Sequence, residues 1–147
     1  MSKFTWSLVV LILLSQSNMA LAANLNLGWF SDVAVDGYDV VSYFTDGKAV
    51  KGNKKYSTNY MNAQWLFSSS EHLKEFKKQP QKYLPQYGGY CAYAMAKGEK
   101  ADIDPKVFSI VSGKLYLNYN IEIGKKWEID KGKYIEKADT HWKEQTQ

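Results

Sequence analysis

The sequence is poor in the residues from which most small sites and scaffolds are built. Its 147 residues include one Cys, two His and three Pro, and all 19 of its basic side chains are Lys. One Cys cannot form an internal disulfide or a four-Cys zinc cage, and two His cannot supply a three-His catalytic metal site. Disulfide scaffolds and the conventional zinc sites are therefore excluded.

Long hydrophobic runs are also absent. The longest covers residues 8–14, which is far shorter than the roughly 20 residues needed to cross a bilayer. It follows Lys3 and precedes the small-residue motif Ala20-Leu21-Ala22, the order typical of a secretory signal peptide. We therefore expect residues 1–22 to be cleaved, and residues 23–147 to be periplasmic or secreted without a stable membrane anchor.

What remains has the composition of a folded domain. Hydrophobic residues make up 45% and aromatic residues 15% of the chain, which excludes a disordered protein. The Lys pairs at 54/55, 77/78 and 125/126 are scattered, so they indicate solvated faces and no nucleic-acid partner. The length predicts a single domain, preceded by a loosely attached arm over residues 25–31.

Alternating apolar residues and turn signals predict two antiparallel pairs of strands. The first pair covers residues 55–60 and 64–68. The second covers 107–111 and 114–118 around the turn Ser112-Gly113.

Helix signals predict several short helices. Ser68 and Glu71 have capping-box spacing before one of them, and Asn120 can cap another. The fold class we expect is a small single α+β domain with a few antiparallel strands and several short helices. The expected helical segments are a turn within 36–44, then 70–78, 80–83, 90–97, 120–130 and 133–143.

The sequence carries no standard catalytic signature. It has no Gly-rich phosphate loop, no G-x-S-x-G, no H-E-x-x-H and no C-x-x-C. This favours a non-enzymatic protein and indicates no certain cofactor.

One stretch, F-S-S-S-E-H-L-K-E-F-K-K-Q-P-Q-K-Y at 67–83, resembles the YHS domain, whose common form is F-C-S-x-x-C-x-x-x-F-x-x-x-P-x-x-Y. Four further segments are similar to an exported branch of that family, so the resemblance spans nearly the whole of residues 23–147. They are D-G-Y-D-V-V-S-Y-F at 36–44, P-Q-Y-G-G-Y-C at 85–91, G-K-L-Y-L-N at 113–118 and A-D-T-H-W at 138–142.

The resemblance implies a metal-handling role, because YHS domains occur beside heavy-metal transport and copper-handling proteins. A metal site has been presumed from the two Cys of the common form. This sequence has Ser68 and His72 at those positions, so the common site does not carry over intact. Of the two, only His72 keeps the chemistry of a metal ligand.

A different set of soft ligands is available in this chain. Cys91 and Met95 are four residues apart in an expected helix, and His72 could add an imidazole from the helix before. Thiolate, thioether and imidazole together select Cu(I), and binding would release the thiol proton. The sequence thus predicts a soft-metal site of His72, Cys91 and Met95, with copper or a similar ion as cargo.

Other interpretations of the same residues stay open. Cys91 and Met95 could be core residues, and His72 an ordinary helix residue. The protein could instead be an interaction or small-ligand module without metal, using the aromatic surface around Tyr87–Tyr93 and an envelope protein or small molecule as partner. Thiol chemistry at Cys91 would need an exposed thiolate of low pKa. The oligomeric state does not follow from the sequence.

Overall fold

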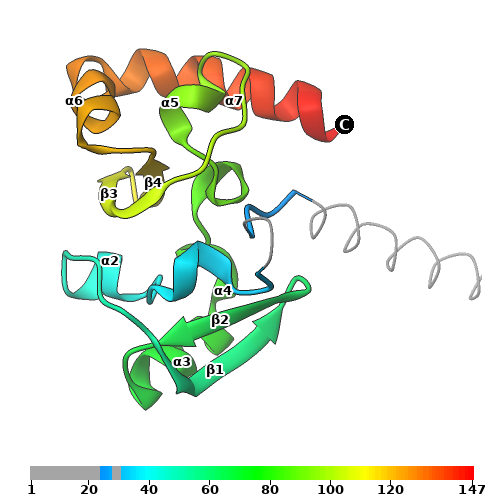
Figure 1. Cartoon of the computed structure of the whole chain (residues 1–147), viewed down its shortest axis with the longest axis vertical. Helices are drawn as coiled ribbons and strands as arrows, with labels where there is room; N and C mark the ends of the chain where they lie inside the picture. The colour runs from blue at the N-terminus through cyan, green and yellow to red at the C-terminus, as the bar shows by residue number, and fades with distance from the viewer. Residues whose placement is uncertain (1–23, 28–30) are drawn as a thin grey trace, which may run out of the picture.

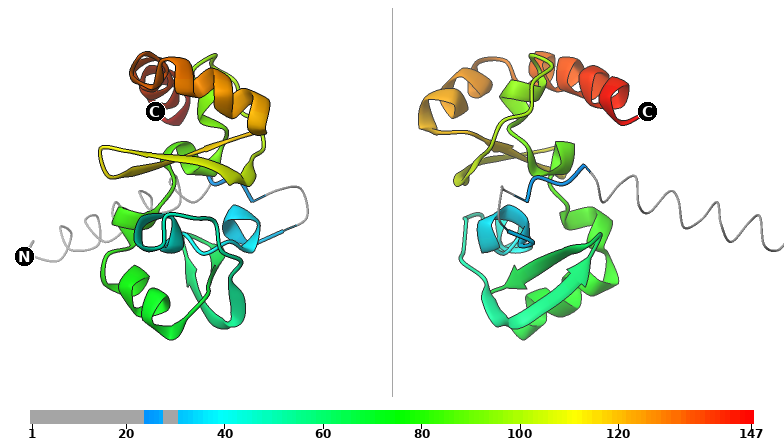
Figure 2. Two further views of the ribbon diagram at one scale, coloured as in Figure 1. Left: turned by 90° about the vertical axis from the view of Figure 1, so that its left-hand side faces the viewer. Right: turned by 45° about the vertical axis from the view of Figure 1, so that its right-hand side comes forward.

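Two β-hairpins form the frame of the fold, one in each half of the molecule (Figure 1). The computed structural model describes residues 24–27 and 31–147, so the predicted signal segment 1–22 lies outside the described residues. As predicted, the architecture is a small α+β domain. The half that carries the first hairpin lies below the half that carries the second, which is covered by the C-terminal helices (Figures 1 and 2).

The first hairpin pairs β1 (Asn53–Tyr60) with β2 (Ala63–Phe67). The turn residues Met61 and Asn62 both have positive φ, at 52° and 58°, which matches the right-handed twist of the strands. The predicted strands 55–60 and 64–68 are confirmed, although β1 begins two residues earlier than predicted and β2 begins and ends one residue earlier.

The second hairpin pairs β3 (Asp104–Val111) with β4 (Lys114–Asn118) around the predicted turn Ser112-Gly113. Side chains alternate across β4, and this strand separates two hydrophobic clusters. Leu115 and Leu117 belong to the first cluster and Tyr116 to the second. Strand β4 is therefore the shared wall between the two halves.

The helices are short except at the C-terminus. Asn120 caps α6 as predicted, its Oδ1 accepting a hydrogen bond from the backbone N of Ile123 at 2.9 Å. No helix among residues 24–27 and 31–147 has the length and apolarity of a membrane span. In chain order the helical elements are η1 (Ala34–Gly37), α2 (Ser42–Thr45), α3 (Ser70–Lys78), α4 (Pro80–Tyr83), η2 (Gln86–Gly89), α5 (Ala92–Met95), α6 (Ile121–Ile129) and α7 (Lys131–Thr146).

Two helix predictions were wrong in extent. In the segment 36–44, Tyr38 is not helical but forms a β-bridge with Lys51, and α2 begins only at Ser42. The predicted helix 90–97 is the single turn α5, and Cys91 is its cap rather than a helical residue.

The N-terminal arm is docked rather than loosely attached where the structure describes it. The backbone N of Asn26 donates to the carbonyl of Gly88 at 2.8 Å, and its side chain donates to the Gly89 carbonyl and to Asp102. Gly88 has a φ of +61°, and a Cβ there would lie 1.9 Å from the carbonyl oxygen of Asn24. Only glycine therefore lets the arm lie in this place.

The contact with the arm predicts an unequal effect of two glycine substitutions. Gly88→Ala should lower the free energy of unfolding by about 3 kcal/mol, because it adds a left-handed backbone penalty and expels the arm with its hydrogen bonds. Gly113→Ala is the matched control, since its φ is +73° but nothing lies within 4 Å of its Cβ position. It should cost only about 1 kcal/mol. Urea unfolding measures both, and equal losses would contradict a role for the arm.

Candidate functional site

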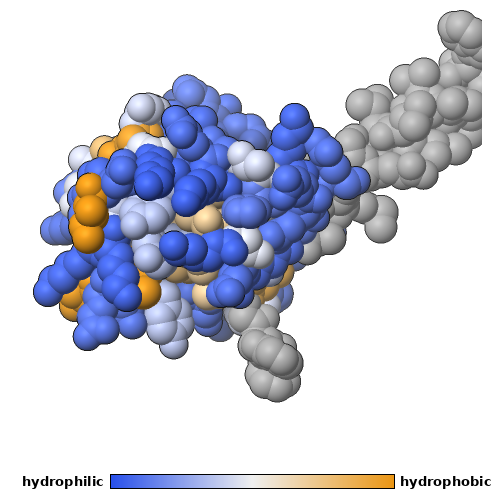
Figure 3. Space-filling view, turned by 90° about the horizontal axis from the view of Figure 1, so that it is seen from above, coloured by the Kyte–Doolittle hydropathy of each residue, from blue (hydrophilic) through white to orange (hydrophobic). Residues whose placement is uncertain are grey.

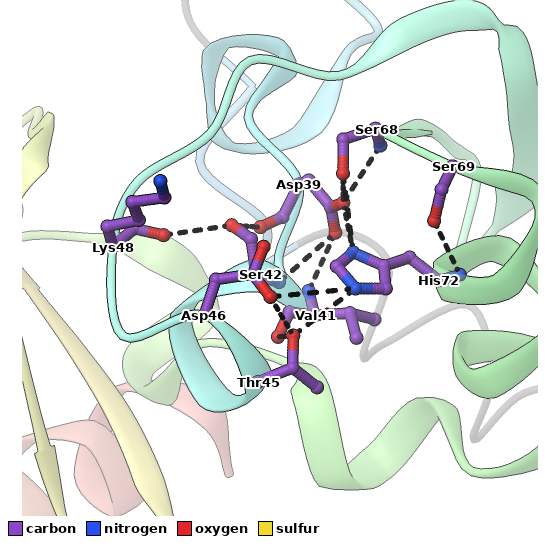
Figure 4. A network of polar contacts seen from close by, with 9 residues as sticks. All are labelled: Asp39, Val41, Ser42, Thr45, Asp46, Lys48, Ser68, Ser69 and His72. Atoms are coloured by element: carbon purple, nitrogen blue, oxygen red, sulfur yellow. Dashed lines mark hydrogen bonds and ion pairs between the residues drawn. The ribbon is translucent and has the colours of Figure 1, made fainter.

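The carboxylate of Asp39 is the centre of a polar network in the first half of the molecule (Figure 4). Asp39 is fully buried at 0% exposure. Its Oδ1 accepts from the backbone N of Val41 at 2.9 Å and of Ser42 at 3.3 Å. Its Oδ2 accepts from the backbone N of Ser68 at 2.8 Å, from Ser68 Oγ at 2.6 Å and from His72 Nδ1 at 2.6 Å. Five donors thus surround one acceptor-only group.

The chain before α2 presents this carboxylate. By accepting from Val41 and Ser42, Asp39 satisfies backbone donors at the start of α2, as a capping residue does. The Ser42 hydroxyl is within hydrogen-bond distance of the carbonyls of Asp39 at 2.7 Å and of Lys48 at 3.0 Å. The segments before and after α2 are therefore both held by hydrogen bonds to Ser42, next to Asp39.

His72 reaches Asp39 from the first turn of α3. The N-cap of this helix is Ser69, whose Oγ accepts from the backbone N of His72 at 3.1 Å. The predicted cap, Ser68, was wrong by one residue because its hydroxyl donates to Asp39 instead. Capping by Ser69 places the imidazole on the side of α3 that faces the Asp39 loop (Figure 4).

The two nitrogens of the imidazole have different surroundings. Nδ1 donates to Asp39, because a carboxylate can only accept. Nε2 lies 3.2 Å from Thr45 Oγ1 and 4.0 Å from Asp46 Oδ1, and the His72 side chain is 16% exposed. In a neutral ring Nε2 then carries the lone pair, which can take up a proton or a metal ion.

Ser68 is not placed as the nucleophile of a serine hydrolase would be. Ser68 Oγ is 3.3 Å from Nδ1, the nitrogen whose hydrogen goes to Asp39, so the ring cannot take the serine proton there. A buried carboxylate that orients an imidazole is a common partner of metal-binding histidines.

Comparison with protein families matches residues 41–87 to the YHS domain. The chain is a YHS domain-containing protein. The match includes α2, the first hairpin, α3 and α4, and thus both Ser68 and His72. Neither a curated protein nor a solved structure matches the chain.

Two of the three predicted metal ligands follow the matched YHS domain in the sequence. Cys91 is 1% exposed in the first hydrophobic cluster, and Met95 is fully buried in the second. Their backbones are linked by the hydrogen bond from Met95 N to the Cys91 carbonyl at 2.9 Å. The side-chain hydrogen bonds of His72 are with Asp39, Ser68 and Thr45, and the ligand set of His72, Cys91 and Met95 stays a prediction.

The surroundings of Cys91 favour its thiol form. Its Sγ lies 3.5 Å from Asn118 Oδ1, to which it can donate, and burial raises the pKa of the thiol. The exposed thiolate of low pKa that thiol chemistry requires is therefore not present. Within the described ranges 24–27 and 31–147, no group of three or more His, Cys, Asp and Glu is arranged to hold a metal ion.

The aromatic surface predicted around Tyr87–Tyr93 is only partly accessible. Tyr87 is 4% exposed, and its hydroxyl donates to Asp139 at 2.8 Å. Tyr90 and Tyr93 are half-buried. Tyr90 lines a cavity of about 330 Å³ together with the docked arm and Lys100, whose Nζ is 5.3 Å from the Tyr90 ring centroid.

The five donors on Asp39 predict a large effect of removing its charge. Asp39→Asn places an NH₂ group where only donors point, so the free energy of unfolding should fall by about 3 kcal/mol. Asp46→Asn is the control, because Asp46 is 37% exposed and 4.0 Å from the ring. Its effect should stay within about 0.5 kcal/mol. Comparable urea midpoints for the two variants would contradict the central role of Asp39.

Burial of Cys91 predicts slow modification and a dependence of stability on pH. A thiol reagent near pH 7.5 should react at least ~10-fold faster with the unfolded chain than with the folded one. Above about pH 8.5 the unfolded thiol ionises while the folded thiol, with its raised pKa, keeps its proton. Unfolding is then favoured, so stability should fall as the pH rises through this range. Cys91→Ala should lose this part of the pH dependence. If the free energy of unfolding changes between pH 7.5 and 9.5 with the same slope in Cys91→Ala as in the wild type, the buried thiol is not its cause.

Proposed function

We propose that this protein handles metal ions in the cell envelope and that His72 of its YHS domain is the metal-binding group. The observation that supports this is the hydrogen bond of 2.6 Å between Nδ1 and the buried Asp39, which leaves Nε2 available on a side chain that is 16% exposed. A hydrogen bond of this kind sets the tautomer, orients the ring and raises the basicity of the free nitrogen.

The oxygen ligands available beside Nε2 help to decide which metal ion would bind. Asp46 offers a carboxylate oxygen 4.0 Å from Nε2, and Thr45 a hydroxyl at 3.2 Å. Imidazole and carboxylate suit divalent ions of intermediate softness, among which Cu²⁺ binds most tightly. Cu(I) prefers sulfur, and both candidate sulfur ligands are buried. We therefore propose copper as Cu²⁺, with Zn²⁺ as the weaker alternative.

His72 and Asp46 alone do not complete the coordination of Cu²⁺ or Zn²⁺. Water or groups from a partner protein would fill the other positions, and a ligand from a partner could then replace water. Such an open site suits transient binding and transfer better than permanent storage. The proposed location in the envelope rests on the signal peptide predicted for residues 1–22.

The histidines give a matched pair of variants for the test. In calorimetric titration with Cu²⁺, His72→Ala should weaken binding at least ~10-fold, because it removes the oriented imidazole. His141→Ala should stay near the wild type, since His141 lies on α7, its side chain is 39% exposed and its ion-pair partner is the exposed Glu144 at 3.5 Å. Circular dichroism checks that both variants are folded.

The same titrations separate the competing sites. Equal affinity of the wild type and His72→Ala for Cu²⁺ and Zn²⁺ would overturn this proposal. Native mass spectrometry with Cu(I) tests the sulfur ligands: uptake by the wild type that is lost in Cys91→Ser would support the set with Cys91 and Met95.

A second candidate function is a small-ligand module that binds no metal. The cavity beside Tyr90, with the cation of Lys100 over the aromatic ring, is the observation that favours it. In this case metal uptake would not depend on His72, and a ligand would protect Tyr90 from labelling.

A further inference from the structure

A second cavity, of about 370 Å³, lies in the other half of the molecule between the β3–β4 hairpin and α6. Val107, Phe108 and Trp127 contribute its apolar lining, and Lys106 and Lys125 also line it. It shares no residue with the Asp39–His72 network. Its volume is in the lower part of the roughly 300–1,000 Å³ range of small-molecule sites.

The walls of this cavity are held by packing. Trp127 is 1% exposed, and its indole Nε1 donates to Ser109 Oγ at 2.9 Å. Phe108 packs edge-on against Tyr43, with the ring centroids 4.7 Å apart. Gly124 lets α6 approach β3, because a Cβ there would be 2.6 Å from Val107 Cγ1. The cavity is therefore preformed.

Positive charge is in excess at this cavity. Glu128 is paired with Lys131 at 2.9 Å. Lys106 and Lys125 are exposed, and within the described part of the chain neither has an acidic partner within 4.0 Å. Two lysines from different elements, β3 and α6, thus present free cations beside an apolar lining. This combination is complementary to a ligand with an apolar body and one negative charge.

The apolar surface continues outward from the cavity along α6. Ile121 lines the cavity and is 66% exposed, and Ile129 at the end of the helix is 79% exposed. Seen from above, the molecule is mostly hydrophilic, with hydrophobic side chains visible at the side where α6 lies (Figure 3). A ligand could extend its apolar part over Ile121.

We propose that this cavity binds a small amphipathic carboxylate. Its apolar body lies against Phe108 and Trp127, and its carboxylate lies between Lys106 and Lys125. This function is independent of His72 and of metal.

Nuclear magnetic resonance spectroscopy tests the proposal on the protein without its signal segment. The probes are octanoate and 3-phenylpropanoate, which separate an alkyl from an aromatic ligand, and the neutral controls are octanamide and 3-phenylpropanamide. At least one carboxylate should shift the Trp127 indole signal, and it should bind about ten-fold more tightly than its amide. His72→Ala should bind it as well as the wild type.

Lysine variants test the role of the charges. Lys106→Ala/Lys125→Ala should weaken binding of the carboxylate about ten-fold and leave that of the amide unchanged. Lys54→Ala/Lys55→Ala is the matched control on β1 and should have no effect.

Three outcomes would overturn the proposal. One is equal affinity for a carboxylate and its amide, because the lysines then play no part. Another is the absence of any shift at Trp127 up to millimolar probe. The third is self-association that Ile121→Lys abolishes, without carboxylate binding, since the occupant would then be a second copy of the chain.

Discussion

The buried carboxylate of Asp39 is the constraint on which the first half of the structure depends. A charge at 0% exposure is tolerated only when hydrogen bonds replace its hydration, and here five donors do so. These donors come from the start of α2 and from the β2–α3 junction, so one side chain joins segments about 30 residues apart. It also explains the residues at the Cys positions of the common YHS pattern. Ser68 and His72 are strong donors to Asp39, whereas a thiol is a weak one.

The two halves of the molecule offer different chemistry. In the first half, Asp39 orients an imidazole whose second nitrogen lies beside Thr45 and Asp46. In the second half, α6 and the β3–β4 hairpin line an open cavity with apolar walls and two exposed lysines. Strand β4 separates them, with alternate side chains in the two hydrophobic clusters. The sulfur atoms of Cys91 and Met95 lie inside these clusters, where they contribute to packing.

Elements that depend on near neighbours were predictable. Both hairpins were, because Ser112-Gly113 and the residues around Asn62 are turn formers between apolar runs. The helix capped by Asn120 was as well. The errors have a common cause: Ser68 was expected to cap α3 and Cys91 to lie within a helix, but contacts with distant residues decided otherwise. Ser68 binds Asp39, and the backbone N of Cys91 donates to the Ala101 carbonyl at 3.0 Å.

The sequence by itself determined the class of fold, the YHS resemblance and His72 as a candidate ligand, because these depend on local patterns and motif spacing. The motif at 36–44 includes Asp39, but nothing in it showed that Asp39 pairs with His72, which is 33 residues away. Only the tertiary structure decided that His72 is oriented by a buried carboxylate, that Cys91 is a buried core residue and that two lysines line one cavity. The reason is physical: burial and the pairing of donors with acceptors depend on which distant segments pack together, and no local pattern specifies that.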